Sequence, residues 1–101
     1  MASTTGWTRI DVTPGNSPYT PSDGESLWLD GSTGSVTVTL PPPSQSTNVR
    51  VIGVDDTNTL TLSDNAGERI TINTTEKSSW GVLEGDRITV ESDGVTWRAV
   101  P

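Results

Sequence analysis

The strongest constraint on the fold of this chain is the alternation of apolar and polar residues, which recurs in short runs along most of its 101 residues. Typical runs are residues 36–40 and 95–99, in which every second residue is apolar. A period of two places one set of side chains on one face of an extended strand. Threonine fills many intervening positions, where a β-branched polar side chain suits the outer face of a strand. The pattern predicts an ordered, all-β chain.

Turn signals separate these runs about every ten residues. Asp-Gly dipeptides at 23–24, 30–31 and 93–94 favour tight turns with positive φ. Two hairpins are predicted, over residues 58–73 and 86–100, and Gly53 is expected to mark a β-bulge within residues 48–54. About eight or nine short strands of this kind predict a compact antiparallel β-sandwich or a jelly-roll-like barrel.

The N-terminal fifth of the chain differs from the rest. Residues 13–24 contain three prolines among small polar residues, which favours a loop or an extended segment. We therefore expect residues 1–20 to form an extended N-terminal arm or loop and residues 21–101 to form a β-sandwich domain, within a single domain overall.

The apolar content is low for a chain of this size, with only 21 Val, Ile and Leu residues. A small domain with a lean core is often completed by oligomerisation, so we expect an obligate homo-oligomer. Trp28 lies out of phase with Leu27 and Leu29 and is expected on the opposite side of its strand. That position makes Trp28 the leading candidate for a contact between subunits.

The composition also restricts the chemistry. The chain has no Cys and no His, which excludes thiolate metal sites and removes the commonest general base. Its net charge of −7 argues against a nucleic-acid partner, and no apolar run approaches the length of a membrane span. We expect a protein that is not an enzyme and that has no cofactor, no nucleic-acid partner and no membrane segment.

Four weaker alternatives remain. Asp55, Asp56 and Asn58, or Asp64 and Asn65 with Glu68, offer oxygen ligands for Ca²⁺, although these residue types also form ordinary turns. Other routes to chemistry are a carboxylate pair for glycoside hydrolysis or a serine activated by Lys77, whose polar surroundings indicate a solvated amine. The four Trp residues and Tyr19 serve either for packing or as a platform that stacks on sugars.

Residues 33–100 carry a series of motifs in a distinctive order. They are Ser35–Pro43 (SVTVTLPPP), Val49–Ile52 (VRVI), Thr59–Leu62 (TLTL), Ile70–Ile72 (ITI) and Ile88–Val100 (ITVESDGVTWRAV). This series resembles the β-domains of tailed-bacteriophage structural proteins: tail fibres, head fibres and capsid decoration proteins. The resemblance implies a trimeric, non-enzymatic module. The polar segment Thr74–Ser79 departs from that family, in which a longer Gly-rich insert is often present.

The chain starts at Met1 and ends soon after the terminal hairpin, so we expect a capsid decoration protein rather than a tail fibre. The expectation is a homotrimer on the outer surface of a phage head, bound to the major capsid protein and stabilising the shell. The candidate capsid-contact residues are Trp7, Arg9, Ile10 and Tyr19, and the candidate subunit-interface residues are Trp28, Leu40, Pro41 and Pro42. The alternative is a fibre or receptor-binding module that recognises a host surface glycan. A third hypothesis is an acidic carbohydrate-binding module of a secreted enzyme.

Overall fold

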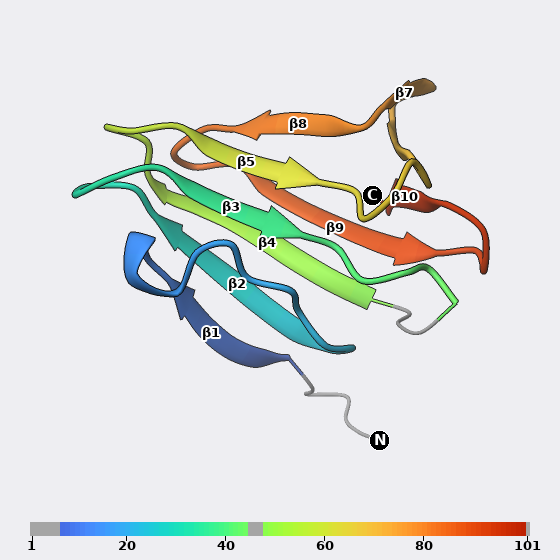
Figure 1. Ribbon diagram of the computed structural model, residues 1–101, viewed down its shortest axis with the longest axis horizontal. Helices are drawn as coiled ribbons and strands as arrows, with labels where there is room; N and C mark the ends of the chain where they lie inside the picture. The colour runs from blue at the N-terminus through green and yellow to red at the C-terminus, as the bar shows by residue number, and fades with distance from the viewer. Residues whose placement is uncertain (1–6, 45–47, 101) are drawn as a thin grey trace.

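Ten strands in two mixed sheets make up most of the fold. The computed structural model describes residues 7–44 and 48–100 (Figure 1). The seven-stranded sheet has the order β1-β2-β4-β9-β10-β6-β7, and the three-stranded sheet has the order β3-β5-β8. The elements are β1 (Thr8–Val12), the 3-10 helix η1 (Pro14–Asn16), β2 (Glu25–Asp30), β3 (Val36–Thr39), β4 (Asn48–Asp55), β5 (Leu60–Ser63), β6 (Ile70–Ile72), β7 (Thr75–Lys77), β8 (Ser79–Val82), β9 (Arg87–Ser92) and β10 (Trp97–Val100).

The core lies between the inner faces of the two sheets. Both sheets contribute alternate residues to it, for example Leu27 and Leu29 from β2 and Val36 and Val38 from β3, all with no exposed surface. Trp97 is also fully buried, and its indole Nε1 donates a hydrogen bond to the carbonyl of Pro41 at 3.1 Å. The period-two pattern therefore marks the buried faces correctly, and the predicted all-β, sandwich-like fold is confirmed.

The two sheets are mixed, so the expected antiparallel pairing holds for only half of the strand pairs: β4–β9, β5–β8, β6–β7 and β9–β10. Four pairs run parallel: β1–β2, β2–β4, β3–β5 and β6–β10. The chain passes from one sheet to the other at each step from β2 to β6, so no two consecutive strands in this stretch pair with each other. Two successive crossings return the chain to its first sheet in the original direction, which makes the pairs β2–β4 and β3–β5 parallel (Figure 1).

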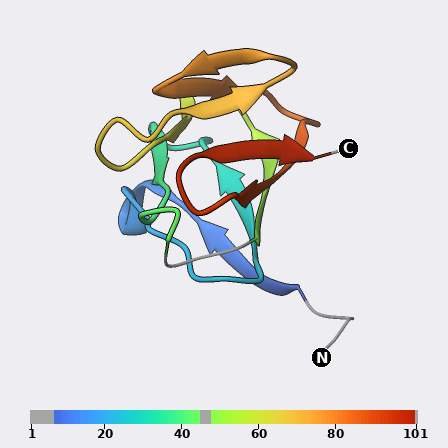
Figure 2. The same ribbon diagram turned by 90° about the vertical axis from the view of Figure 1, so that its right-hand side faces the viewer.

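Only the second of the two predicted hairpins exists. Strands β9 and β10 pair antiparallel around the Asp93-Gly94 turn, with Trp97 opposite Ser92 (red in Figure 2). In contrast, β5 belongs to the small sheet and β6 to the large one, so residues 64–69 connect the two sheets instead of closing a hairpin. The polar segment 74–79 instead contributes β7, which pairs antiparallel with β6.

The extended N-terminal arm is not confirmed. Strand β1 is an edge strand of the large sheet and pairs with β2, and Val12 at its end is fully buried. Tyr19 is joined to β3 by backbone hydrogen bonds with Thr37 and Thr39, at 3.0 and 2.9 Å. These residues thus belong to the same sandwich as the rest of the chain. Residues 1–6 of the expected arm lie outside the described residues.

The bulge expected at Gly53 is confirmed. The register between β2 and β4 shifts there, because Leu29 lies opposite Gly53 whereas Asp30 lies opposite Asp55, which leaves Val54 as the extra residue. The described part of the chain has no helix with the length and hydropathy needed to cross a membrane.

Candidate functional site

The outer face of the large sheet carries a group of arginine and aromatic side chains. We call six residues on this outer side the Arg–Trp face. Trp7 directly precedes β1, and the other five point away from the core on β1, β2, β4 and β9: Arg9, Trp28, Arg50, Ile52 and Arg87. Each alternates with residues that pack on the inner face, such as Leu27, Val51 and Ile88. The face is built from four neighbouring strands of one sheet, which give it a fixed geometry.

Trp28 is the centre of this face. The strand register places Trp28, Ile52 and Arg87 in one row across β2, β4 and β9. The guanidinium carbon of Arg9 lies 4.1 Å from the centroid of the Trp28 ring, and that of Arg87 lies 6.0 Å away. Ile52 is only 4% exposed although it is not part of the main core, so this cluster forms a second apolar layer outside the sandwich.

The indole nitrogen of Trp28 has no hydrogen-bond partner within the described chain, although it is buried. An unsatisfied buried N–H group costs free energy, and a native protein rarely keeps one without compensation. The cation–π contacts with Arg9 and Arg87 offset part of this cost. The Trp28 ring is therefore held by its contacts with the two arginines, while its buried N–H group has no hydrogen-bond partner among the described residues.

A second cation–π pair extends the face toward the start of β1. Arg50 lies over the ring of Trp7 at 4.4 Å, and Arg9 forms an exposed ion pair with Asp11 at 2.9 Å. Exposed pairs of this kind contribute little to stability, about 0–1 kcal/mol. The Arg9–Asp11 pair therefore leaves the guanidinium of Arg9 accessible to another anionic group.

The distribution of positive charge is strongly uneven. The whole chain has six Lys and Arg residues and a net charge of −7. Three of the six arginines and lysines lie on the Arg–Trp face, and a fourth, Arg98, points from the same side of the sheet on the neighbouring strand β10 and pairs with Asp93 at 3.3 Å. The same side of the sheet also carries Asp11, Asp30 and Glu91, and Arg98 is paired with Asp93, so these basic residues lie among at least as many acidic ones.

Five carboxylates gather at one end of the sandwich, where β2 and β4 end and the β8–β9 turn lies beside them. We call this group the acidic end: Asp30, Asp55, Asp56, Glu84 and Asp86. Hydrogen bonds connect its segments, since the Glu84 backbone N–H donates to Asp56 at 3.1 Å and Gly53 donates to the carbonyl of Asp86 at 3.0 Å. Hydrogen bonds from Thr57 lower the pKa of Asp55, so this carboxyl group is ionised at neutral pH.

The structure separates the eight residues that the sequence singled out. Trp7, Arg9 and Trp28 come together on the Arg–Trp face, although the first two were predicted for capsid contact and the third for a subunit interface. Ile10 and Tyr19 pack against the core, and Tyr19 donates a hydrogen bond to Glu25 at 2.9 Å.

Leu40 and Pro41 are buried within the single chain, and Pro42 is half-buried beside them. Leu40 is part of the core itself, and the carbonyl of Pro41 accepts the hydrogen bond from Trp97. Packing inside one chain thus accounts for the burial of Leu40 and Pro41, and their role at a subunit interface stays a prediction.

Sequence reasoning missed Arg50, Ile52 and Arg87. Arg50 and Arg87 occupy outward positions of alternating runs, and the change of phase after Val51 marked Ile52. These signals show on which side of its strand each residue lies, but not which residues of other strands lie beside it. Only the order β2-β4-β9 shows that the three residues adjoin Trp28.

The other two tryptophans have structural contacts. Trp80 donates a hydrogen bond from Nε1 to the carbonyl of Ile70 at 2.9 Å and so connects the two sheets, while Lys77 lies over its ring at 4.5 Å. Trp97 is buried in the core. A cation thus lies over the ring of each partly exposed tryptophan, which reduces the indole surface open to a sugar.

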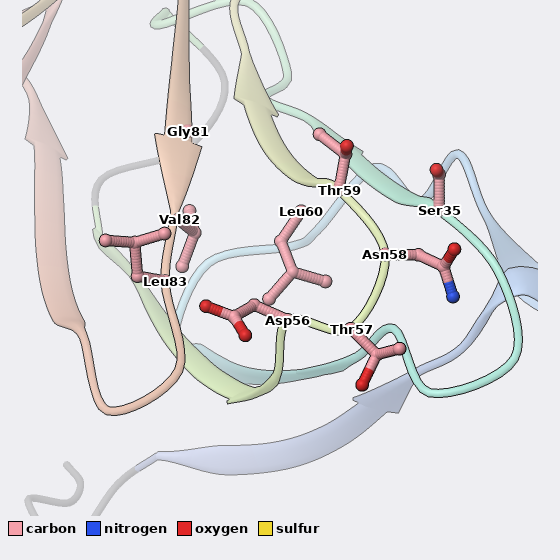
Figure 3. Close-up of a pocket in the computed structure, with 9 residues that line it drawn as sticks. All are labelled: Ser35, Asp56, Thr57, Asn58, Thr59, Leu60, Gly81, Val82 and Leu83. Atoms are coloured by element: carbon pink, nitrogen blue, oxygen red, sulfur yellow. The ribbon is translucent and has the colours of Figure 1, made fainter.

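A shallow pocket of about 360 Å³ lies near the acidic end (Figure 3). Its lining comes from residues 56–60, from Ser35 and from the end of β8, with Leu60 and Val82 almost fully buried. The polar groups of the 56–60 segment already bind the chain, since the Asn58 side chain donates to the carbonyl of Gly31 at 2.7 Å. The exposed residues Ser35 and Thr59 add hydroxyl groups to its lining.

The carboxylates considered for Ca²⁺ hold turns together. Asp64 accepts a hydrogen bond from the Arg69 backbone at 3.0 Å, and Glu68 accepts bonds from Asn65 and Ala66 at 3.1 and 2.9 Å. Within residues 7–44 and 48–100, no three acidic side chains are placed so that they could share one metal ion. The hydrogen bonds agree with the interpretation of these residues as turn formers.

No protein-family model matches this chain, and no curated protein matches its sequence.

Proposed function

We propose that this chain is a non-enzymatic structural protein of a bacteriophage particle, which acts as a homotrimer on the outer surface of the head. The observation that carries the proposal is the Arg–Trp face, where Trp28 and Ile52 form an apolar layer outside the core, with Arg9 and Arg87 over the ring of Trp28 and Arg50 over that of Trp7. Tryptophan and arginine are the residues that most often dominate the binding energy of protein interfaces. The resemblance of residues 33–100 to phage β-domains gives the kind of particle.

In this proposal the protein stabilises the shell by contact alone. A protein that binds the assembled shell, and not the separate capsid subunits, shifts the equilibrium toward the shell by mass action. The turn carboxylates are engaged in hydrogen bonds with backbone N–H groups, which favours a binding role over acid–base chemistry. The high content of Ser and Thr and the acidic surface suit a particle that must not aggregate.

The fold changes how the shell contact is best tested. Deletion of residues 1–12 removes strand β1 and the fully buried Val12, so lost binding in such a variant reports on folding. Point variants of exposed side chains are more informative. We therefore define the test by oligomeric mass and by binding of the intact chain to phage heads.

Sedimentation equilibrium at several concentrations tests the trimer. The expected mass is three times the 10.7 kDa of one chain, independent of concentration in the micromolar range. Co-sedimentation with heads stripped of decoration proteins tests the second part, with heads that retain their full complement as control. A monomer at all concentrations, or a trimer that binds no stripped head, contradicts the proposal.

The glycan-binding alternative has its own measurement. Saturable quenching of tryptophan fluorescence by a cell-surface polysaccharide supports a receptor-binding module, and silence across a broad panel counts against it. The same sugar response in a monomer points to the isolated carbohydrate-binding module.

A further inference from the structure

We propose that the open edge of strand β8 pairs with β8 of a second copy of this chain, antiparallel and about a two-fold axis. The contact goes beyond the proposed function, because a two-fold contact does not build a trimer. Within a trimer it joins one trimer to another, and between single chains it gives a dimer.

The other three sheet edges in the described part of the chain are protected. The edge of β3 is covered by residues 17–19, since Tyr19 forms backbone hydrogen bonds with Thr37 and Thr39 at 3.0 and 2.9 Å. Strands β1 and β7 each carry two charged side chains, and β7 is only three residues long. Covered, charged and very short edges are the devices by which natural sheets avoid pairing with other chains.

The edge of β8 is left without a charge or a cover. Residues Ser79–Val82 (SWGV) contain no charged residue and no proline, and the register with β5 has no bulge. Strand β8 is the outermost strand of the small sheet, and Figure 1 shows no described strand beyond it. It is as long as β3, whose edge the chain covers, so length alone does not protect it.

The hydrogen-bond pattern shows which backbone groups of β8 face the open edge. Asp64 N donates to the carbonyl of Ser78 at 2.8 Å, so the ladder with β8 starts at a hydrogen-bonded pair. Such pairs alternate along an antiparallel ladder, so Ser79 and Gly81 point their N–H and C=O groups away from β5. Both residues are exposed. Four backbone groups are thus open to a second strand.

A second β8 matches these four groups in one register. With Trp80 on the two-fold axis, Ser79 of each copy lies opposite Gly81 of the other, and each such pair exchanges two hydrogen bonds. A shift one way places Ser79 opposite Leu83, whose N–H already donates to Asp86 at 2.9 Å. A shift the other way reaches β7, which belongs to the other sheet. The register at Trp80 therefore satisfies all four groups and sets the two Trp80 side chains side by side, a favourable cross-strand pair.

Charge also favours a second copy as the occupant. A chain of net charge −7 repels its own copies, and residues 78–83 form an uncharged stretch where two copies can approach. Lys77 precedes this stretch and Glu84 follows it, so antiparallel pairing brings the Lys77 of each copy toward the Glu84 of the other. Glu76 alternates with Lys77 and points to the opposite side of β7.

Hydrogen exchange of backbone amides tests the contact in the intact wild-type chain. The amides of Ser79 and Gly81 are expected to exchange at least about tenfold more slowly at millimolar than at low micromolar concentration, because pairing protects them. The amides of Trp80 and Val82, which bond to β5 in the same ladder, are the internal control and stay protected throughout. Sedimentation equilibrium over the same range is expected to show the mass double, from one chain to two or from three chains to six.

The variant Gly81→Pro removes one of the edge N–H groups. That N–H points away from β5, and proline is tolerated at an open edge, so the fold is expected to persist while the mass no longer doubles. Gly81→Ala is the matched control, because it keeps the N–H and its Cβ meets no atom within 4 Å, so the doubling should remain. Far-ultraviolet circular dichroism confirms that both variants are folded.

The outcomes distinguish this contact from the proposed trimer. Doubling from one chain to two supports the β8 contact and contradicts the trimer. A mass of three chains with fast exchange at Ser79 and Gly81 at every concentration supports the trimer and overturns the contact. A monomer at every concentration overturns both. Protection of the two amides in a trimer that does not double, or doubling that survives in folded Gly81→Pro, overturns the two-fold pairing as well.

Discussion

The substitution Gly53→Ala tests how the bulge in β4 holds the acidic end together. An ideal Cβ at residue 53 lies 2.0 Å from the carbonyl oxygen of Leu83 and 2.8 Å from its carbon, both backbone atoms. The turn that contains Leu83 is also hydrogen-bonded to Gly53 on both sides: Gly53 N donates to Asp86 at 3.0 Å, and Gly85 N donates to the carbonyl of Gly53 at 2.9 Å. An added methyl group must push this turn away.

The size of the effect follows from these contacts. Loss of the two hydrogen bonds costs roughly 1–3 kcal/mol at about 0.5–1.5 each. Overpacking of a close backbone contact adds roughly 1–3 kcal/mol. We therefore expect Gly53→Ala to lower the free energy of unfolding by about 2–6 kcal/mol, a large share of the roughly 5–15 kcal/mol available to a domain of this size.

Urea denaturation followed by tryptophan fluorescence measures this change. Gly81→Ala is the matched control, because Gly81 lies in a strand and a Cβ there meets no atom within 4 Å. We expect that control to be neutral or slightly stabilising, since alanine restricts the unfolded chain. If Gly53→Ala remains within about 1 kcal/mol of the wild type, the close approach of the β8–β9 turn to β4 is not as described.

Three further predictions concern single side chains. Trp28→Ala should weaken assembly at least tenfold while lowering the unfolding free energy by only about 1–2 kcal/mol, and an unchanged oligomeric mass would refute its interface role. Thr74 has φ of +70°, so Thr74→Gly should raise the free energy of unfolding by about 0.5–1 kcal/mol, whereas Thr75→Gly in β7 should lower it. Hydrogen bonds from Thr96 and Val95 hold the pKa of Asp93 below its ordinary 3.8. The ionised Asp93 therefore contributes to the free energy of unfolding above pH 3.8, and this contribution is lost as the pH falls through the lower pKa of the folded state. Asp93→Asn should accordingly reduce the loss of stability between about pH 5 and pH 2 in an acid titration.

The sequence alone determined which side of each strand is buried. Alternation in runs such as Val36–Leu40 separates core from surface, because successive side chains of a strand point to opposite faces. The same logic placed Trp28 outside the core and Gly53 at a bulge. It also identified the β9–β10 hairpin, whose Asp-Gly turn is a local signal that needs no distant partner.

Tertiary structure decided which strands are neighbours. The hairpin expected over residues 58–73 fails because a turn sequence fixes a change of direction but not the sheet that the chain enters next. The Arg–Trp face has the same origin: Arg9, Trp28 and Arg87 are far apart in sequence and meet only through the order β1-β2-β4-β9. The period of a strand is a local property of the backbone, whereas the neighbours of a strand depend on hydrogen bonds between distant segments.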